Sequence, residues 1–222
     1  MNNDIINQVD TPVVSQGVKN KVLKNTYMLL AMTLLFSGAV AAVSTSMNLP
    51  HPGLLITLVV FFGLLFAISK FQNSAMGIVL VFALTGFMGL TLGPILNAYL
   101  SLPGGSSIVM NAMGVTGAIF LGLSAYVLTT KKDFSFMGGF LTVGIIVGFL
   151  AGLGAIFFEM PALSLAVSAM FVLLMSGLIL YETSNIINGG ETNYIMATTT
   201  LFVSIFNLFT SLLHLLGFAS QE

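Results

Sequence analysis

The chain has 222 residues, of which 57% are hydrophobic and 6% charged, with a formal net charge of -1. A soluble domain is about a quarter charged, so this chain has too few polar side chains to cover a water-facing surface. Six lysines and no arginine form no basic face for nucleic acid, and the absence of cysteine excludes disulfides and cysteine metal sites. We therefore predict an integral membrane protein that binds no nucleic acid and holds no metal or cofactor.

The first segment, residues 1–20, is polar and of mixed charge. We expect it to be a flexible cytoplasmic tail, because it has no helical or strand period long enough to pack. The apolar run that follows is longer than a signal-peptide core and lacks a clear cleavage site. We interpret that run as a retained membrane span.

Apolar runs near the length of a membrane span fill the rest of the chain. There are seven of them, at residues 26–46, 54–69, 76–100, 107–129, 136–158, 162–181 and 194–219. In the third run, Gly93-Pro94 should kink or end the helix, because proline lacks the backbone donor. The pattern predicts an all-α protein with a single seven-helix transmembrane domain over residues 21–222.

The lysines predict the topology, since basic residues mark the cytoplasmic side of a membrane protein. Lys19, Lys21 and Lys24 precede the first span, Lys70 follows the second, and Lys131 and Lys132 follow the fourth. This alternation places the N-terminus inside the cell and, with seven full spans, the C-terminus outside. A re-entrant seventh run would return the C-terminus to the inside.

Two stripes of small residues lie in the fourth and fifth spans. Gly114, Ala118 and Gly122 repeat every four residues, and Gly144, Gly148 and Gly152 do the same. Because such stripes allow helix backbones to approach closely, we expect the fourth and fifth spans to pack tightly.

The last helix carries one polar face. Its members are spaced by three or four residues and are Thr200, Ser204, Asn207, Ser211 and His214. Lipid offers no hydrogen bonds, so this face should meet protein or a water-filled crevice, or bond back to its own helix. Interhelical hydrogen bonding and a path or ligand cavity both remain open.

Two glutamates flank the loop before this helix. Glu182 lies at the end of the sixth run, where an ionisable group at membrane depth is a candidate proton-sensitive switch. The alternative is a solvated position at the headgroup level. Glu191 should be a first-turn acid that favours the helix dipole.

Three sequence segments resemble the Bax inhibitor-1, or transmembrane Bax inhibitor motif, family. They are LGPILNAYL at 92–100, SAYVLTTKKDFSFMGGFL at 124–141 and LYETSNIINGGETNYI at 180–195. The resemblance runs from about residue 20 to the end and is closest to the bacterial YccA branch, whose members modulate the FtsH protease. It implies seven membrane helices with the last one surrounded by the other six.

The same resemblance implies two functions. Members are described as calcium-permeable, pH-sensitive leak channels with an aspartate pair on helices six and seven. Glu182 is similar to the first of these, but Ser204 stands at the second position and carries no charge. The YccA branch instead implies an inner-membrane regulator that binds FtsH and its membrane companion proteins and restrains degradation of membrane proteins, without being an enzyme itself.

We favour the regulator, with the calcium or proton leak as the alternative. Candidate pH-sensing or pore residues are Glu182, Ser204, Asn207 and His214. Lys131, Lys132 and Asp133 form a candidate partner-facing loop. An intramembrane serine protease using Ser176 and His214 lacks a nucleophile loop, and a retinal pump lacks a lysine in the last helix.

Overall fold

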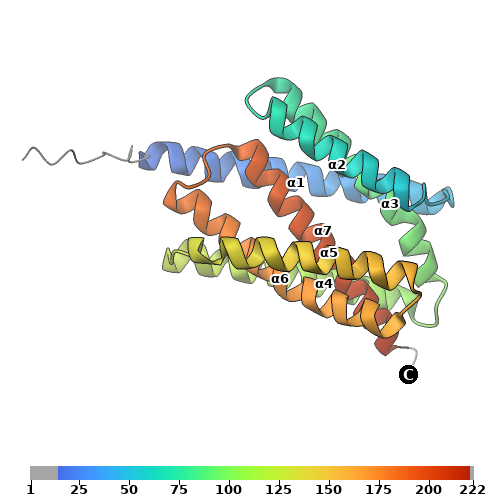
Figure 1. Ribbon diagram of the computed structural model, residues 1–222. Helices are drawn as coiled ribbons and strands as arrows, with labels where there is room; N and C mark the ends of the chain where they lie inside the picture. The colour runs from blue at the N-terminus through green and yellow to red at the C-terminus, as the bar shows by residue number, and fades with distance from the viewer. Residues whose placement is uncertain (1–14, 221–222) are drawn as a thin grey trace, which may run out of the picture.

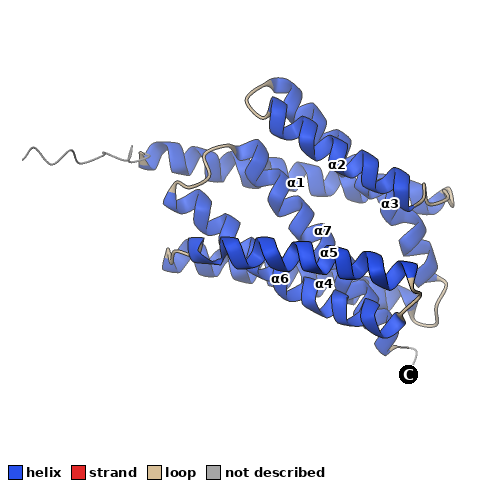
Figure 2. Ribbon diagram, in the orientation of Figure 1, coloured by secondary structure: helices blue, strands red, loops and turns tan. Residues whose placement is uncertain are grey.

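The computed structural model describes residues 15–220, and all the regular structure within them is helical (Figures 1 and 2). The elements are α1 (Gln16–Ser46), α2 (Leu54–Phe71), α3 (Ala75–Leu100), α4 (Gly105–Thr130), the short 3₁₀ helix η1 (Ser135–Met137), α5 (Gly138–Phe157), α6 (Pro161–Asn188) and α7 (Tyr194–Ala219). Seven helices in this part of the chain are long and apolar enough to cross a membrane. The prediction of an all-α, seven-helix membrane protein is confirmed.

The first helix starts earlier than the sequence suggested. α1 begins at Gln16, so residues 16–20, which we assigned to the tail, are helical. The Lys19 ammonium donates to the Asn188 carbonyl at 3.1 Å, which ties this first turn to the end of α6. The lysines mark the membrane edge, but the helix continues past it. Residues 1–14 of the expected tail lie outside the described residues.

The last helix is central in the bundle. α7 contacts α1, α2, α3, α4 and α6, whereas α5 packs on α6 and η1 and not on α7. In Figure 1, α7 runs obliquely between the group formed by α1, α2 and α3 and the group formed by α4, α5 and α6. The expectation that all six other helices surround α7 is therefore correct for five of them.

Proline neither ends α3 nor leaves a backbone group unsatisfied. The helix continues through Pro94 to Leu100. A proline at 94 cannot donate to the carbonyl four residues earlier, at Leu90. The Ser44 hydroxyl of α1 donates to that carbonyl at 2.9 Å instead. Gly89 and Gly93 allow this approach, because a Cβ on either would collide with Ser37 or Ser44. The proline thus becomes a point of attachment between α1 and α3.

The two stripes of small residues behave differently. On α5, a side chain at Gly144 would meet Leu174, and one at Gly148 would meet Met170 and Phe171, so this stripe packs closely on α6. On α4, a Cβ at Gly114 or Gly122 would meet nothing within 4 Å. The expectation of tight packing is correct for α5 and wrong for α4. The reason is that α4 packs against α3, α6 and α7 through its other faces.

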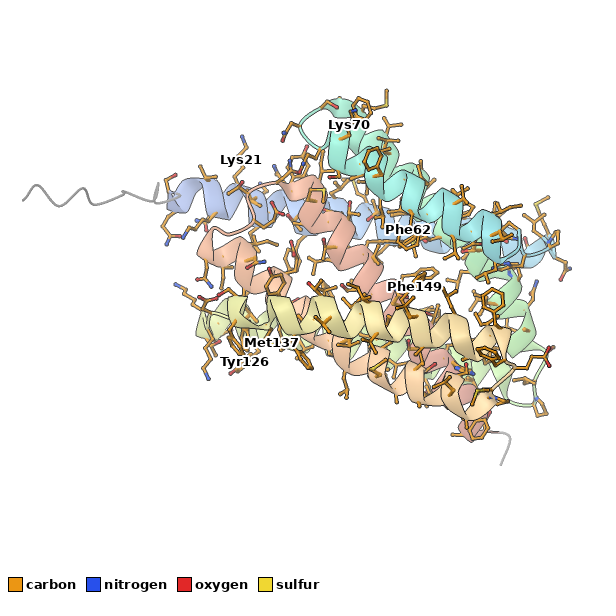
Figure 3. All side chains as sticks on the ribbon, viewed as in Figure 1. Lys21, Phe62, Lys70, Tyr126, Met137 and Phe149 are labelled. Atoms are coloured by element: carbon orange, nitrogen blue, oxygen red, sulfur yellow. The ribbon has the colours of Figure 1, made fainter. Side chains whose placement is uncertain are left out.

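All six lysines lie at one end of the bundle. The start of α1, the α2–α3 loop, the end of α4 and the α6–α7 loop gather on the left of Figure 1. Lys21, Lys70 and Tyr126 lie toward this end in Figure 3, whereas Phe62 and Phe149 meet near the middle with ring centroids 5.7 Å apart. We call it the lysine end. The opposite end carries the α1–α2, α3–α4 and α5–α6 loops.

Candidate functional site

Glu182 is buried inside the bundle near the lysine end. It lies on α6, six residues before the helix ends at Asn188, and is 5% exposed. Its Oε1 has no hydrogen-bond partner among residues 15–220, and within that range it forms no ion pair. The expected alternative of a solvated headgroup position does not fit this burial. When a buried carboxyl group loses its proton, it changes from a neutral group that can donate a hydrogen bond into a charged group that can only accept one.

Polar contacts join α1 to α6 and α7, and one of them is made by Thr183, the residue that follows Glu182 in the sequence. The Tyr27 and Thr183 hydroxyls lie 3.4 Å apart, and Thr198 donates to the Thr26 carbonyl at 3.3 Å. Two further buried hydroxyls in the described chain lack partners, those of Thr26 on α1 and Ser124 on α4. Buried polar atoms are normally paired, and Glu182 is the one ionisable residue among these three exceptions.

The polar face of α7 largely satisfies itself. Ser204 is fully buried and donates to the Thr200 carbonyl at 2.7 Å. The Asn207 amide likewise donates to Val203 at 2.8 Å. By helical rise, Ser204 is about 15 Å from the start of α7 and Glu182 about 9 Å from the end of α6. No hydrogen bond joins Glu182 to Ser204 within the described residues. Ser204 and Asn207 of this face therefore bond back to their own helix.

His214 makes the one hydrogen bond that links the polar face of α7 to α6 in the described structure. Its Nδ1 lies 2.8 Å from the Ser168 hydroxyl. That hydroxyl also lies 3.0 Å from the Ser164 carbonyl, and which group donates between Ser168 and His214 depends on the histidine tautomer. Ser176, by contrast, donates to Val172 of its own helix. Ser176 and His214, the pair considered as a nucleophile and its base, are therefore not hydrogen-bonded to each other within the described residues.

We expected Glu191 in the first turn of α7, but it lies before the helix begins at Tyr194. It precedes the cap residue Asn193, whose side chain accepts from the backbone of Ile195 and Met196. The Glu191 carboxylate accepts the Asn193 N–H at 2.6 Å. Asn193 also donates to Gln72 at 3.0 Å. Glu191 therefore orients the cap that fastens α7 to the α2–α3 loop.

The loop of Lys131, Lys132 and Asp133 is held against the end of α6. Ser184 accepts the Phe134 N–H at 2.9 Å and donates to the Lys132 carbonyl at 3.2 Å. The Lys132 ammonium lies 5.7 Å from the centroid of the Tyr126 ring. The N–H of Ser135 donates to Asp133 at 2.8 Å and lowers the pKa of that exposed carboxyl. The loop therefore has a fixed shape.

Ser184 is a site residue that sequence reasoning missed. It is fully buried, next to Glu182 and Thr183. The only signal for it was its place in the ETSN segment, four residues before Asn188, which donates to it at 3.1 Å. Through Ser184, the Glu182 helix and the Lys131–Asp133 loop form one unit.

A groove between four of the helices is apolar. It has a volume of about 590 Å³ and lies between α1, α3, α4 and α7. The phenylalanines Phe202, Phe206 and Phe209 contribute to its lining, with Ser37 and Thr116 as the polar exceptions. It suits hydrocarbon better than a hydrated ion.

Comparison with known proteins identifies the family. The family model described as inhibitor of apoptosis-promoting Bax1 matches residues 19–221. The chain belongs to this Bax inhibitor family. It is 55% identical over 203 residues to the Escherichia coli protein named modulator of FtsH protease YccA, covering 91% of this chain and 92% of that one.

Two other bacterial proteins are similar to this chain over most of their length. An uncharacterized Pseudomonas aeruginosa protein is 56% identical over 215 residues, 97% of each chain. An uncharacterized membrane protein of Vibrio cholerae is 47% identical over 204 residues, 91% of this chain and 92% of that one. The resemblance to the Bax inhibitor family and its YccA branch is confirmed.

Proposed function

We propose that this chain is a bacterial inner-membrane regulator that binds the FtsH protease complex and restrains the degradation of other membrane proteins. The observation that carries the proposal is the 55% identity to the E. coli modulator of FtsH protease, extending over 91% of the chain. A second E. coli relative of equal identity is named inner membrane protein YccA. The partners in this proposal are FtsH, its membrane companion proteins and the lipid bilayer.

The lysine end is the part of the molecule that we assign to the cytoplasm in this proposal. The Lys131, Lys132 and Asp133 loop supports a contact there, because Ser184 fixes its shape and Lys131 and Lys132 expose their charges. A partner can recognise a preformed charged loop without the cost of ordering it.

The first test is purification of the tagged chain from bacterial membranes in a mild detergent. We expect FtsH and its membrane companions to co-purify, and Asp133→Lys to weaken their recovery. The matched control is Glu159→Lys, because Glu159 is an exposed acid in the α5–α6 loop at the opposite end. Absence of FtsH from the wild-type preparation, under conditions that retain its other companions, contradicts the proposal.

A pH-sensitive calcium or proton leak is the second candidate, and the burial of Glu182 with an unpaired oxygen is the observation that favours it. Three features weigh against it. Ser204 replaces the second acid, Ser204 and Asn207 bond to their own helix, and the groove between α1, α3, α4 and α7 is apolar. Calcium flux into vesicles carrying the purified chain tests it, with Glu182→Gln as the comparison. A flux that depends on pH and is altered by that substitution establishes the leak.

A further inference from the structure

A polar pocket opens at the lysine end between α1, α4 and α6. Its volume is about 270 Å³. It is lined by Gln16, Lys19 and Asn20 of α1, by Lys131 at the C-terminal cap of α4 and by Asn188 of α6, and three aliphatic side chains complete the lining. The pocket thus brings together residues from helices that are far apart in the sequence.

The charge of this pocket is uncompensated within the described structure. Both ionisable residues in its lining are lysines, and no carboxylate contributes to the lining. The nearest acid in sequence, Asp133, accepts the Ser135 N–H. The Lys19 ammonium uses one of its three protons on the Asn188 carbonyl and keeps two available. The adjacent amides of Gln16 and Asn20 add neutral donors. The combination suits a singly charged anion with several acceptor oxygens.

The adjacent residues Lys131 and Lys132 have different surroundings. Lys132 lies over the Tyr126 ring and is not part of this pocket's lining, whereas Lys131 is part of it. Lys131 ends α4 with φ of +52°, and its side chain forms no hydrogen bond or ion pair with any residue from 15 to 220. Of the two adjacent cations, one has an aromatic partner and the other faces the pocket.

The sequence around the pocket is typical of the level of lipid headgroups. Lys131 directly follows the uncharged helix α4, and Lys19 lies on the lysine-bearing first turns of α1. Basic pockets between membrane helices at this level bind anionic headgroups. The aromatic rings of Tyr126, Phe134 and Phe136, in the same region of the chain, are of the kind that accompanies the interface.

We propose that this pocket binds the phosphodiester headgroup of an anionic phospholipid, with Lys19 and Lys131 as its two cationic contacts. The phosphate oxygens accept from both ammonium groups and from the Gln16 and Asn20 amides. The lipid then bridges α1 and α4, which do not pack directly on each other except through the rings of Tyr27 and Phe120. This inference rests on the pocket; it shares Lys131 with the proposed FtsH contact, but its test measures retained lipid and does not require FtsH.

The test compares two double variants that remove the same charge from the same end. In the first, Lys19→Gln is combined with Lys131→Asn, since asparagine tolerates the left-handed backbone at 131. In the second, Lys21→Gln is combined with Lys70→Gln; both side chains are exposed, and neither lines the pocket. Native mass spectrometry of the full chain measures retained phosphatidylglycerol against phosphatidylcholine.

We expect the pocket variant to lose about thirtyfold in preference for phosphatidylglycerol, from about fivefold per lysine near a membrane surface. The control variant should lose less than threefold. Equal losses in both would show that diffuse surface charge, not a pocket, holds the lipid, and would overturn the proposal. Inorganic phosphate titrated as a competitor should not displace the lipid at millimolar concentration; displacement there would assign the site to a free anion instead.

The single variants keep the test decisive if the double variant fails to fold. Lys19→Gln also removes the hydrogen bond to Asn188, whereas Lys131→Asn removes no hydrogen bond seen in residues 15–220. Folding of each is checked by thermal denaturation in detergent. A folded Lys131→Asn protein that retains phosphatidylglycerol as well as the wild type contradicts the proposal.

Discussion

Ser44→Ala tests the attachment between α1 and α3 at the proline. The Ser44 hydroxyl, on a residue that is 1% exposed, supplies the donor that Pro94 cannot give to the Leu90 carbonyl. Its loss leaves that carbonyl unsatisfied in an apolar setting. We expect the free energy of unfolding to fall by about 1–2 kcal/mol, between an average interhelical hydrogen bond in a membrane protein and the cost of an unsatisfied buried group.

A double-mutant cycle separates this hydrogen bond from simple packing. In a Pro94→Ala background, the N–H of residue 94 can donate to Leu90 within the helix. Ser44→Ala should then cost less than about 0.5 kcal/mol, which gives a coupling energy of about 1 kcal/mol.

The assay is unfolding of the purified protein by dodecyl sulfate in mixed micelles. Ser46→Ala is the control, because that exposed hydroxyl donates only to Val43 of its own helix, and it should change stability by less than about 0.5 kcal/mol. If Ser44→Ala costs the same with and without the proline, the Leu90 carbonyl is not what Ser44 stabilises.

Three further predictions concern the loops and the buried acid. Glu182→Gln should change the pH dependence of conformation, measured by protease protection in vesicles. Glu191→Gln should only lower the free energy of unfolding, by about 0.5–1 kcal/mol, because its bond to the Asn193 cap is weaker. Matching pH profiles for the two variants would contradict this division. The hydrogen bond from the Ser135 N–H lowers the pKa of Asp133, so the bond is present above the ordinary pKa of 3.8 and is lost as pH falls through the lower folded-state pKa. The Ser135 amide resonance should therefore titrate with a midpoint below pH 3.8, and in Asp133→Asn its chemical shift should not change with pH. A midpoint at or above 3.8 would refute this prediction. The chain has no cysteine, so single cysteines can report its topology. A cysteine at Ser106 should react with an impermeant maleimide outside intact cells, and a cysteine at Lys131 should not. Labelling at 131 would contradict the predicted topology.

The spans could be predicted from the sequence because a membrane helix is a local property of composition. An uncharged run of about twenty residues is sufficient, and the lysines mark its ends. The start of α1 was misplaced because lysines report the membrane boundary, not the helix boundary, and Gln16 to Asn20 can remain helical in water.

Helix partners could not be predicted in the same way. A stripe such as Gly114 to Gly122 shows that close approach is possible but not which helix approaches, and here no atom of residues 15–220 comes within 4 Å of a Cβ placed at Gly114 or Gly122. The contacts of Ser168 and Ser184 could not be predicted from the sequence for the same reason. Their roles depend on His214 and on the backbone at Lys132 and Phe134, which are 46 to 52 residues away along the chain. For Glu182 the residue could be identified, but its burial required the packed bundle.

The central claim, regulation of FtsH, is tested most directly by the lifetime of another membrane protein that FtsH degrades. The half-life of that substrate is followed by a chase in cells that lack this chain, in cells that overproduce it, and in both backgrounds with inactive FtsH. We predict that overproduction lengthens the half-life when FtsH is active and changes nothing when it is inactive. An unchanged half-life in cells with active FtsH, at a level where the chain is present and folded in the membrane, would contradict the account.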